Sequence, residues 1–479
     1  MPNAFSYLML LGWPLLGWFI AKRQSVSDSA VVLLILVPYL LLPVSASIDL
    51  PGLPPLDKVS VPSLTVLAIL SRRYKKFAFF PDSGGEKLLM LLLLVFPLFT
   101  FINNVDAYST GGRYMVGLSI MDVFSMVFAN ATLVLIPVMA GYLYLNTSEA
   151  HRRMLIIVLL AGLAYSLLIL WEVRMSPRLH HQIYGFFPHS WKQQIREGGF
   201  RPVVFLGHGL RVAVFFAMVT IAGLVLRKAR DYPMRHWGLI KCLYLVAVLV
   251  LCKTWSALIY AALALAVIVL LGARGWVKVA KILAVIVILF PLLRGADLVP
   301  TADIADFIAE YNEARAGSLA FRFYHEDLLL EKAREKPWFG WGGWGRSRVF
   351  DPETGQDLSV TDGEWIIRYG TYGWFGYLVP FGLLTLSLWK LAALYKQKTY
   401  RNPSPYTAGL ALILAFSMLD QLPNSSINPL MFLVAGAILG LVNREAQLCQ
   451  AAQGVAGGGR LNSKPRRRAF SRQSNSAAR

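Results

Sequence analysis

The residues of this chain best suited to chemistry are basic side chains at the start of an apolar run. Arg201 begins the stretch Arg-Pro-Val-Val-Phe-Leu-Gly-His208-Gly, and Arg211 follows it inside the run. His208 and Arg211 are three residues apart and would share one face of a helix. A helix N-terminus flanked by two guanidinium groups suits a phosphate or a pyrophosphate. The pattern predicts an anion site here; an interfacial role for Arg201 and a structural role for His208 are the alternatives.

Two carboxylates and a lysine form the next group of candidates. Asp362 and Glu364 lie in Thr361-Asp-Gly-Glu-Trp365, shortly before another apolar run, and either of them can supply a general base. The alternative for each is a helix cap or an ion pair with a nearby arginine. Lys253 lies in a tight turn between two apolar runs. It is either an interfacial lysine or a third cation directed at the same anion.

A glycine- and tryptophan-rich stretch runs from Trp338 to Gly345. It predicts a tight turn whose Trp341 and Trp344 side chains pack in the protein, lie at headgroup level or stack on a sugar. His325-Glu-Asp327 offers metal-type ligands, but consecutive residues of a helix point in different directions and chelate poorly together. We therefore predict no required metal and no cofactor, with arginines supplying the charge neutralisation.

The composition of the chain predicts the kind of structural element that positions these residues. The chain has 479 residues, of which 56% are hydrophobic and 15% charged, and its mean hydropathy is +0.52. A soluble domain has about 25% charged residues, so this chain cannot cover a water-facing surface of that size. A soluble enzyme, a disordered protein and a fibrous protein are excluded. The sequence predicts an all-α polytopic membrane protein.

Apolar runs long enough for membrane helices recur along the chain. We expect about 12–13 transmembrane helices, near 4–21, 28–46, 59–71, 86–102, 117–144, 154–171, 207–226, 237–252, 255–273, 278–293, 372–392, 405–420 and 427–443. Basic residues fall in alternate connections, which the positive-inside rule assigns to the cytoplasm. They are Lys22, Arg23, Arg72, Arg73, Lys75, Lys76, Arg152, Arg153, Arg227, Lys228, Arg230, Arg235, Arg274, Lys278, Lys281, Lys396, Lys398 and Arg401.

This assignment divides the chain into regions. Residues 1–293 form transmembrane helices with an external arginine-rich segment at 172–211, and residues 294–371 form a large periplasmic loop with amphipathic helices near 301–311 and 318–335. Residues 372–443 form the C-terminal transmembrane helices. Residues 444–479 are a basic, disordered cytoplasmic tail, which suits anionic lipid better than nucleic acid. Much of the net charge of +20 therefore orients the protein, and the remainder lies at the candidate site.

The order of these pieces resembles the Wzy/WaaL-like superfamily of bacterial O-antigen ligases and polysaccharide polymerases. The resemblance covers roughly residues 190–392. It is carried by the Arg-Pro-x-x-Phe-x-x-His-Gly stretch, the external loop with Arg322, Lys336-Pro-Trp-Phe-Gly-Trp-Gly342 and Gly373-Trp-Phe-Gly-Tyr-Leu378. It implies a GT-C-type fold in the bacterial inner membrane. It also implies metal-independent transfer of a glycan from undecaprenyl pyrophosphate to an acceptor hydroxyl, on a glycan or a lipid, at the periplasmic face.

The resemblance also implies roles for particular residues. In such enzymes external arginines bind the pyrophosphate, which fits Arg201 and Arg322 by position. The ligases have a Ser-Arg pair where this chain has Thr254-Trp255, so Lys253 would stand in for that arginine. They have a catalytic histidine where this chain has Asp362, which favours a polymerase over a ligase. The full set is Arg201, Arg211, Arg322, Lys253 and His208 for the pyrophosphate, Asp362 or Glu364 as base, and Trp341 and Trp344 for sugar stacking.

Two other classes of protein compete with this hypothesis. A transporter would place intramembrane charges along an ion or solute path, and it often shows inverted repeats. The chain has no convincing internal repeat, and its charges gather at one face. A non-catalytic scaffold for glycan assembly would tolerate loss of the candidate residues. The sugar, its linkage and the acceptor stay open.

Overall fold

The computed structural model describes residues 1–458 except 24–27, 74–79, 82–83, 197, 232–237, 398–399 and 401–402. Residues 459–479 of the predicted disordered tail lie outside the described residues, whereas residues 444–458 are helical, so the prediction of disorder was wrong for that part. Several basic residues that were assigned to the cytoplasm also lie outside the described residues: Lys75, Lys76, Arg235, Lys398 and Arg401.

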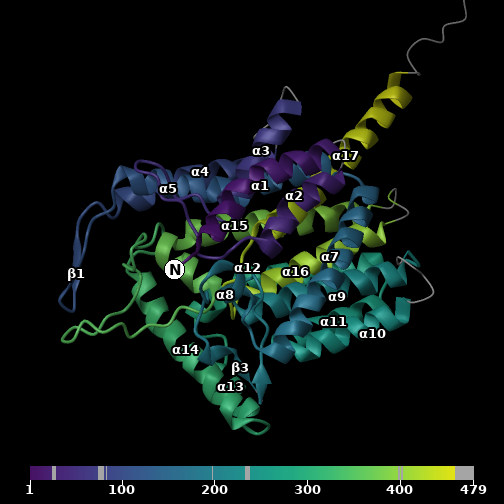
Figure 1. Cartoon of the computed structure of the whole chain (residues 1–479). Helices are drawn as coiled ribbons and strands as arrows, with labels where there is room; N and C mark the ends of the chain where they lie inside the picture. The colour runs from purple at the N-terminus through teal and green to yellow at the C-terminus, as the bar shows by residue number, and fades with distance from the viewer. Residues whose placement is uncertain are drawn as a thin grey trace, which may run out of the picture.

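Within the described residues the chain is built almost entirely from helices, with two short β-hairpins (Figure 1). Eight helical segments are long and apolar enough to cross a membrane: α1 (Ala4–Arg23), α4 (Gly85–Ile102), the continuous α5 (Ile120–Asn130) to α6 (Ile136–Tyr144), α7 (Ser148–Met175), α9 (Gly209–Lys228), α12 (Ala273–Gly295), α15 (Glu364–Lys396) and α17 (Pro429–Gly458). Five apolar helices are shorter: α2 (Asp28–Leu41), α3 (Ser60–Arg73), α10 (Gly238–Leu251), α11 (Trp255–Leu270) and α16 (Pro405–Asp420). Each apolar run in the sequence coincides with one of these helices, and the fold is that of an all-α polytopic membrane protein.

Helix α9 is enclosed by other helices. It packs against α7, α10, α11 and α16, and nearly all of its side chains from Val212 to Leu226 are buried. A helix that is apolar on every side is stable where neighbouring helices surround it. Outer helices differ: α1 exposes Leu8, Leu11 and Leu15, as expected for a lipid-facing surface. The N-terminus of α9, with its histidine and arginine, is therefore placed at the middle of one end of the bundle.

The connections between helices gather at two ends of the bundle. At one end, ion pairs join separate segments: Arg152 with Asp231, which follows α9, Arg153 with Asp28 and Lys390 with Glu86. At the other end, Arg211 and Arg322 donate to carbonyl oxygens of the connection between α16 and α17. We call this second end the arginine end. The two groups of connections that the charge pattern distinguished are thus spatially separate.

The long connection between α12 and α15 contains two helices, as expected. They are α13 (Thr301–Ala309) and α14 (Glu313–Arg334), which form a hairpin at the arginine end (Figure 1). Helix α15 has two helical parts that meet at a break at Gly373, whose φ of +66° suits glycine. The expected helix near 372–392 matches the second part, and the expected boundary at 371 lies close to the break. The first part, which begins at Glu364, was not expected.

Candidate functional site

Buried side chains fix the connection that carries Arg201 into α9. Glu172, which is 0% exposed at the end of α7, accepts hydrogen bonds from the backbone N–H groups of Val203 at 2.7 Å and Val204 at 2.8 Å. The hydroxyl of Tyr165 accepts one from the N–H of Phe205 at 3.1 Å. Hydrogen bonds to an ionised carboxylate are stronger than neutral ones. This connection is β4 (Gly199–Phe200) to α9, and α7 determines its path.

Arg201 is buried between two other connections. Its Nη2 donates to the carbonyl oxygen of Lys253 at 3.2 Å. Its carbon stem packs on Gly209, where a Cβ atom would lie 2.1 Å from the Cδ atom of Arg201. The Lys253 ammonium donates in turn to the carbonyl oxygen of Arg196 at 2.9 Å. The structure therefore places Arg201 and Lys253 side by side, and it requires glycine at position 209.

His208 is the N-cap of α9. Its Nδ1 accepts a hydrogen bond from the N–H of Leu210 at 3.0 Å. Burial, and then the charges of His189, Arg201, Arg211 and Arg322, lower the pKa of His208 to about 3. The imidazole is therefore neutral, which fits the structural alternative for this residue. Arg201 packs on Gly209, the residue after His208, and Arg211 follows in the first turn of α9.

The connection between α16 and α17 holds two of these arginines. Arg211 Nη2 donates to the carbonyl oxygen of Ser425 at 3.3 Å, and Arg322 Nη1 donates to that of Pro423 at 3.1 Å. Among the described residues, no carboxylate lies within ion-pair distance of Arg211. Carbonyl oxygens satisfy part of the hydrogen bonding of a guanidinium group without cancelling its charge. The positive charge of Arg211 is thus available to a ligand.

Sequence reasoning missed this connection. Asp420, which is 0% exposed, accepts from Asn424 Nδ2 at 2.8 Å and from Ser426 Oγ at 2.7 Å, and these bonds shape the turn. The available signal was the polar run Asp-Gln-Leu-Pro-Asn-Ser-Ser-Ile-Asn428 between two apolar helices. A buried carboxylate with several local partners indicates a turn that is held in one conformation.

The two candidate bases have different surroundings. The Asp362 carboxylate lies 3.3 Å from Arg322 Nε, and its side chain is 37% exposed. Glu364 is buried, and both of its oxygens are used: Oε1 accepts from Arg368 Nε at 2.7 Å, and Oε2 accepts from the hydroxyl of Ser425. Glu364 therefore matches the alternative of an ion pair with a nearby arginine. Of the two carboxylates, Asp362 is the one accessible to a substrate.

The two tryptophans that were predicted to stack on sugar occupy different environments. Trp341 is 5% exposed, packs 4.9 Å from Tyr108 between ring centres, and has the ammonium of Lys332 at 3.6 Å over its ring. Its indole donates to the carbonyl oxygen of Lys332. Trp341 thus matches the packing alternative, because protein groups cover its ring. Trp344 is 69% exposed and donates to Asp122 at 2.9 Å, so its ring is free to meet lipid or sugar.

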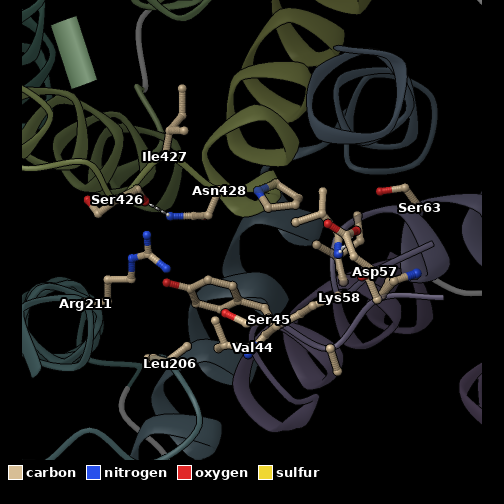
Figure 2. Close-up of a pocket in the computed structure, with 17 residues that line it drawn as sticks. Val44, Ser45, Asp57, Lys58, Ser63, Leu206, Arg211, Ser426, Ile427 and Asn428 are labelled. Carbon is tan, nitrogen blue, oxygen red and sulfur yellow. Dashed lines mark hydrogen bonds between the residues drawn. The ribbon is translucent and has the colours of Figure 1, made fainter. Parts of the chain in front are cut away.

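A cavity adjoins the site at Arg211 (Figure 2). Its volume is about 260 Å³. Its walls come from the end of α2, the connection from α2 to α3, the start of α9 and the connection from α16 to α17. Sequence reasoning did not single out its other cation, Lys58, which precedes α3 and donates to the carbonyl oxygen of Phe205 at 2.7 Å.

A buried carboxyl group lies one helical turn beyond Arg322 on α14. Glu326 is 7% exposed; its Oε1 accepts from the indole N–H of Trp365 at 3.3 Å, and its Oε2 lies 3.9 Å from Arg294 Nε. Burial raises the pKa of Glu326 to about 7, although Trp365 and Arg294 oppose the rise. Among the described residues, no three His, Cys, Asp or Glu side chains are placed to hold a metal ion.

Glu326→Gln is expected to flatten the pH dependence of stability. The carboxyl titrates near 4.5 when unperturbed and near 7 in the fold, so the folded state holds the extra proton between these values. The free energy of unfolding therefore falls as pH rises through this window, by about 2–3 kcal/mol at pH 8. Glutamine keeps the acceptor for Trp365 and removes the titration. Melting temperatures in detergent at pH 5 and pH 8 measure the difference.

Glu331→Gln, on the exposed side of the same helix, is the matched control and should keep the wild-type pH dependence. An unchanged pH dependence in Glu326→Gln would show that another group is responsible.

No family model matches the chain, and no curated protein matches it significantly. The fold and the site together define an integral membrane protein with a cationic site at one end of its helices. Its function is argued from that site.

Proposed function

We propose that the protein is a metal-independent membrane glycosyltransferase of the polysaccharide polymerase type, with O-antigen ligase as the second choice. It would transfer a glycan from undecaprenyl pyrophosphate to an acceptor hydroxyl. The observation that carries the proposal is that Arg201 packs on Gly209 at the start of α9, that Arg211 and Arg322 both donate to the connection between α16 and α17, and that Asp362 lies beside Arg322. We call these three arginines the arginine cluster.

The arginine cluster suits a pyrophosphate that is anchored by a lipid. Its members lie where membrane helices end, so the lipid tail can stay in the bilayer while the charged headgroup meets the guanidinium groups. Arg201 donates to the carbonyl oxygen of Lys253 and Arg211 to that of Ser425, and a phosphate oxygen can replace each carbonyl oxygen as a stronger acceptor. Charge that develops on the departing pyrophosphate is stabilised by donors that are already in place.

Asp362 is the general base of the proposed reaction. As the acceptor oxygen bonds to the anomeric carbon, its proton passes to the carboxylate of Asp362. The bond between that carbon and the phosphate oxygen breaks, and its electron pair leaves with the pyrophosphate. Arg322 contacts Asp362 at 3.3 Å and belongs to the arginine cluster, so it connects the base with the leaving group.

The proposal also orients the protein. The end opposite the arginine cluster carries basic residues such as Lys22, Arg152 and Arg274, and the positive-inside rule assigns that end to the cytoplasm. The arginine cluster then faces the periplasm of a bacterial inner membrane. In this arrangement the connection from α12 to α15 is the large periplasmic loop of a GT-C-type enzyme.

Reconstitution in liposomes tests the function. With an undecaprenyl-pyrophosphate-linked glycan as donor, we expect a longer or transferred glycan and release of undecaprenyl pyrophosphate, with no loss of rate in EDTA. Protein-free liposomes are the control. Flux of an ion or glycan across the bilayer without a new glycosidic bond would support a transporter. Neither product nor flux would support a scaffold.

A further inference from the structure

The cavity beside Arg211 has two cations on different walls. Figure 2 shows Arg211 on one side and Lys58 on the other, with Asn428 at the edge between them. Arg201, His208, Arg322 and Asp362 do not line it. Arg211 is therefore the residue that this cavity shares with the arginine cluster.

Lys58 has capacity to bind a ligand. An ammonium group has three donors, and the contact of Lys58 within the described residues is the single hydrogen bond to Phe205. Burial, and then the charge of Arg211, hold the pKa of Lys58 well below its usual range. An anion placed between the two cations would offset both the loss of hydration of the Lys58 ammonium group and its repulsion by Arg211, and would therefore favour the charged lysine.

The neighbouring carboxylate does not fill this role. Asp57 Oδ1 accepts hydrogen bonds from the N–H groups of Val59 at 2.9 Å and Ser60 at 2.8 Å, and from the Ser60 hydroxyl. These bonds cap the start of α3. Among the described residues, no carboxylate lies within ion-pair distance of Lys58. Asp57 lines the cavity but is paired with neither cation, and two cations without a paired carboxylate among the described residues indicate a site for an external anion.

The remaining walls suit a sugar. Ser45, Ser47 and Asn428 offer hydrogen-bonding groups, while Leu206 and Ile427 offer apolar surface. At about 260 Å³ the cavity is smaller than the roughly 300–1,000 Å³ of sites for drug-sized ligands, so it takes one sugar residue and not a chain.

We propose that this cavity binds a charged sugar of the acceptor, holding its carboxylate or phosphate group between Lys58 and Arg211. The inference rests on the proposed function only in calling this ligand the acceptor. It implies that the enzyme selects acidic acceptors, because a neutral sugar leaves both cations without a partner in a partly desolvated space.

Binding of small probes to the full chain in nanodiscs tests the site. We expect glucuronate or glucose 6-phosphate to bind at least about tenfold more tightly than glucose. The comparison of the two acidic sugars tells whether carboxylate or phosphate is preferred. Lys58→Met should remove this preference, and Lys192→Met, at an exposed lysine of the same end, should keep it.

A second variant guards against a folding defect, since Lys58 also holds the backbone of Phe205. Asn428→Asp keeps the acceptor for the N–H of Leu430 and adds a carboxylate to the cavity wall, so it should weaken acidic sugars and spare glucose. Melting temperatures confirm that each variant is folded.

Inorganic pyrophosphate separates this site from the arginine cluster. Arg201→Ala should weaken pyrophosphate binding at least about tenfold, whereas Lys58→Met should change it less than about threefold. The inference is overturned if acidic sugars bind no better than glucose, or if Lys58→Met weakens pyrophosphate as much as Arg201→Ala does. Failure of glycan transfer in liposomes would overturn the proposed function and leave this binding result intact.

Discussion

Arg201→Ala and Arg322→Ala are each expected to abolish polymer formation while the protein reaches the membrane in normal amounts. Each substitution removes a guanidinium group that would stabilise the negative charge of the departing pyrophosphate. Loss of one such donor typically lowers turnover by about 10²–10³-fold. Loss of the Arg322 side chain also removes the partner of Asp362. Release of undecaprenyl pyrophosphate in reconstituted liposomes measures turnover, and immunoblots of the membrane fraction measure the amount of protein that reaches the membrane.

Two further variants sharpen this test. Arg201→Lys keeps the charge but loses the planar fork of donors, so partial activity is expected. Arg334→Ala is the matched control, because Arg334 lies exposed on the same helix as Arg322 and donates to the carbonyl oxygen of Gly295. It should retain wild-type turnover. Full activity in Arg201→Ala or Arg322→Ala would exclude the arginine cluster as the pyrophosphate site.

Asp362→Asn should lower turnover by about 10²–10⁴-fold, the usual contribution of a general base. Donor binding should persist, because asparagine keeps the shape of the side chain and the arginine cluster stays intact. Single-turnover measurements with a labelled donor separate binding from transfer. A wild-type rate would exclude Asp362 as the base.

Glu364→Gln provides the contrast. The Glu364 carboxylate is buried and joins Arg368 to Ser425, so the substitution should lower stability more than it lowers the turnover of folded protein. If Glu364→Gln instead keeps the wild-type stability and lowers turnover by the factor predicted for Asp362→Asn, Glu364 is the base.

Much of the helical framework could be predicted because its signal is local. A membrane helix must form its backbone hydrogen bonds within itself and present apolar side chains to lipid. The residues of each run therefore indicate by themselves whether the run is a membrane helix. The amphipathic pattern that begins at Ile304 likewise placed α13. The part of α15 before Gly373 was not predicted, because Trp365-Ile-Ile-Arg368 is followed by Gly370 and Gly373, which interrupt the pattern. This part packs on the protein through Trp365 and Tyr369, which are buried.

The candidate site was less predictable because its parts act through contacts across the chain. Asp362 and Glu364 are equivalent as residue types, and only packing shows that Ser425 and Arg368 occupy one of them. Lys58 has no motif of its own. Its significance comes from facing Arg211 across a cavity whose walls come from four parts of the chain.

The sequence by itself determined that this chain is a helical membrane protein with arginine-bearing connections separate from its other basic connections. Those properties depend on how each segment partitions between lipid and water, which its own residues decide. Only the tertiary structure decided that Arg211 and Arg322 meet at one connection and that Arg322 lies beside Asp362. That arrangement depends on α14 packed against α15, and on a turn after Asp420 whose carbonyl oxygens receive the two arginines. Such convergence is a property of long-range packing, which no single segment encodes.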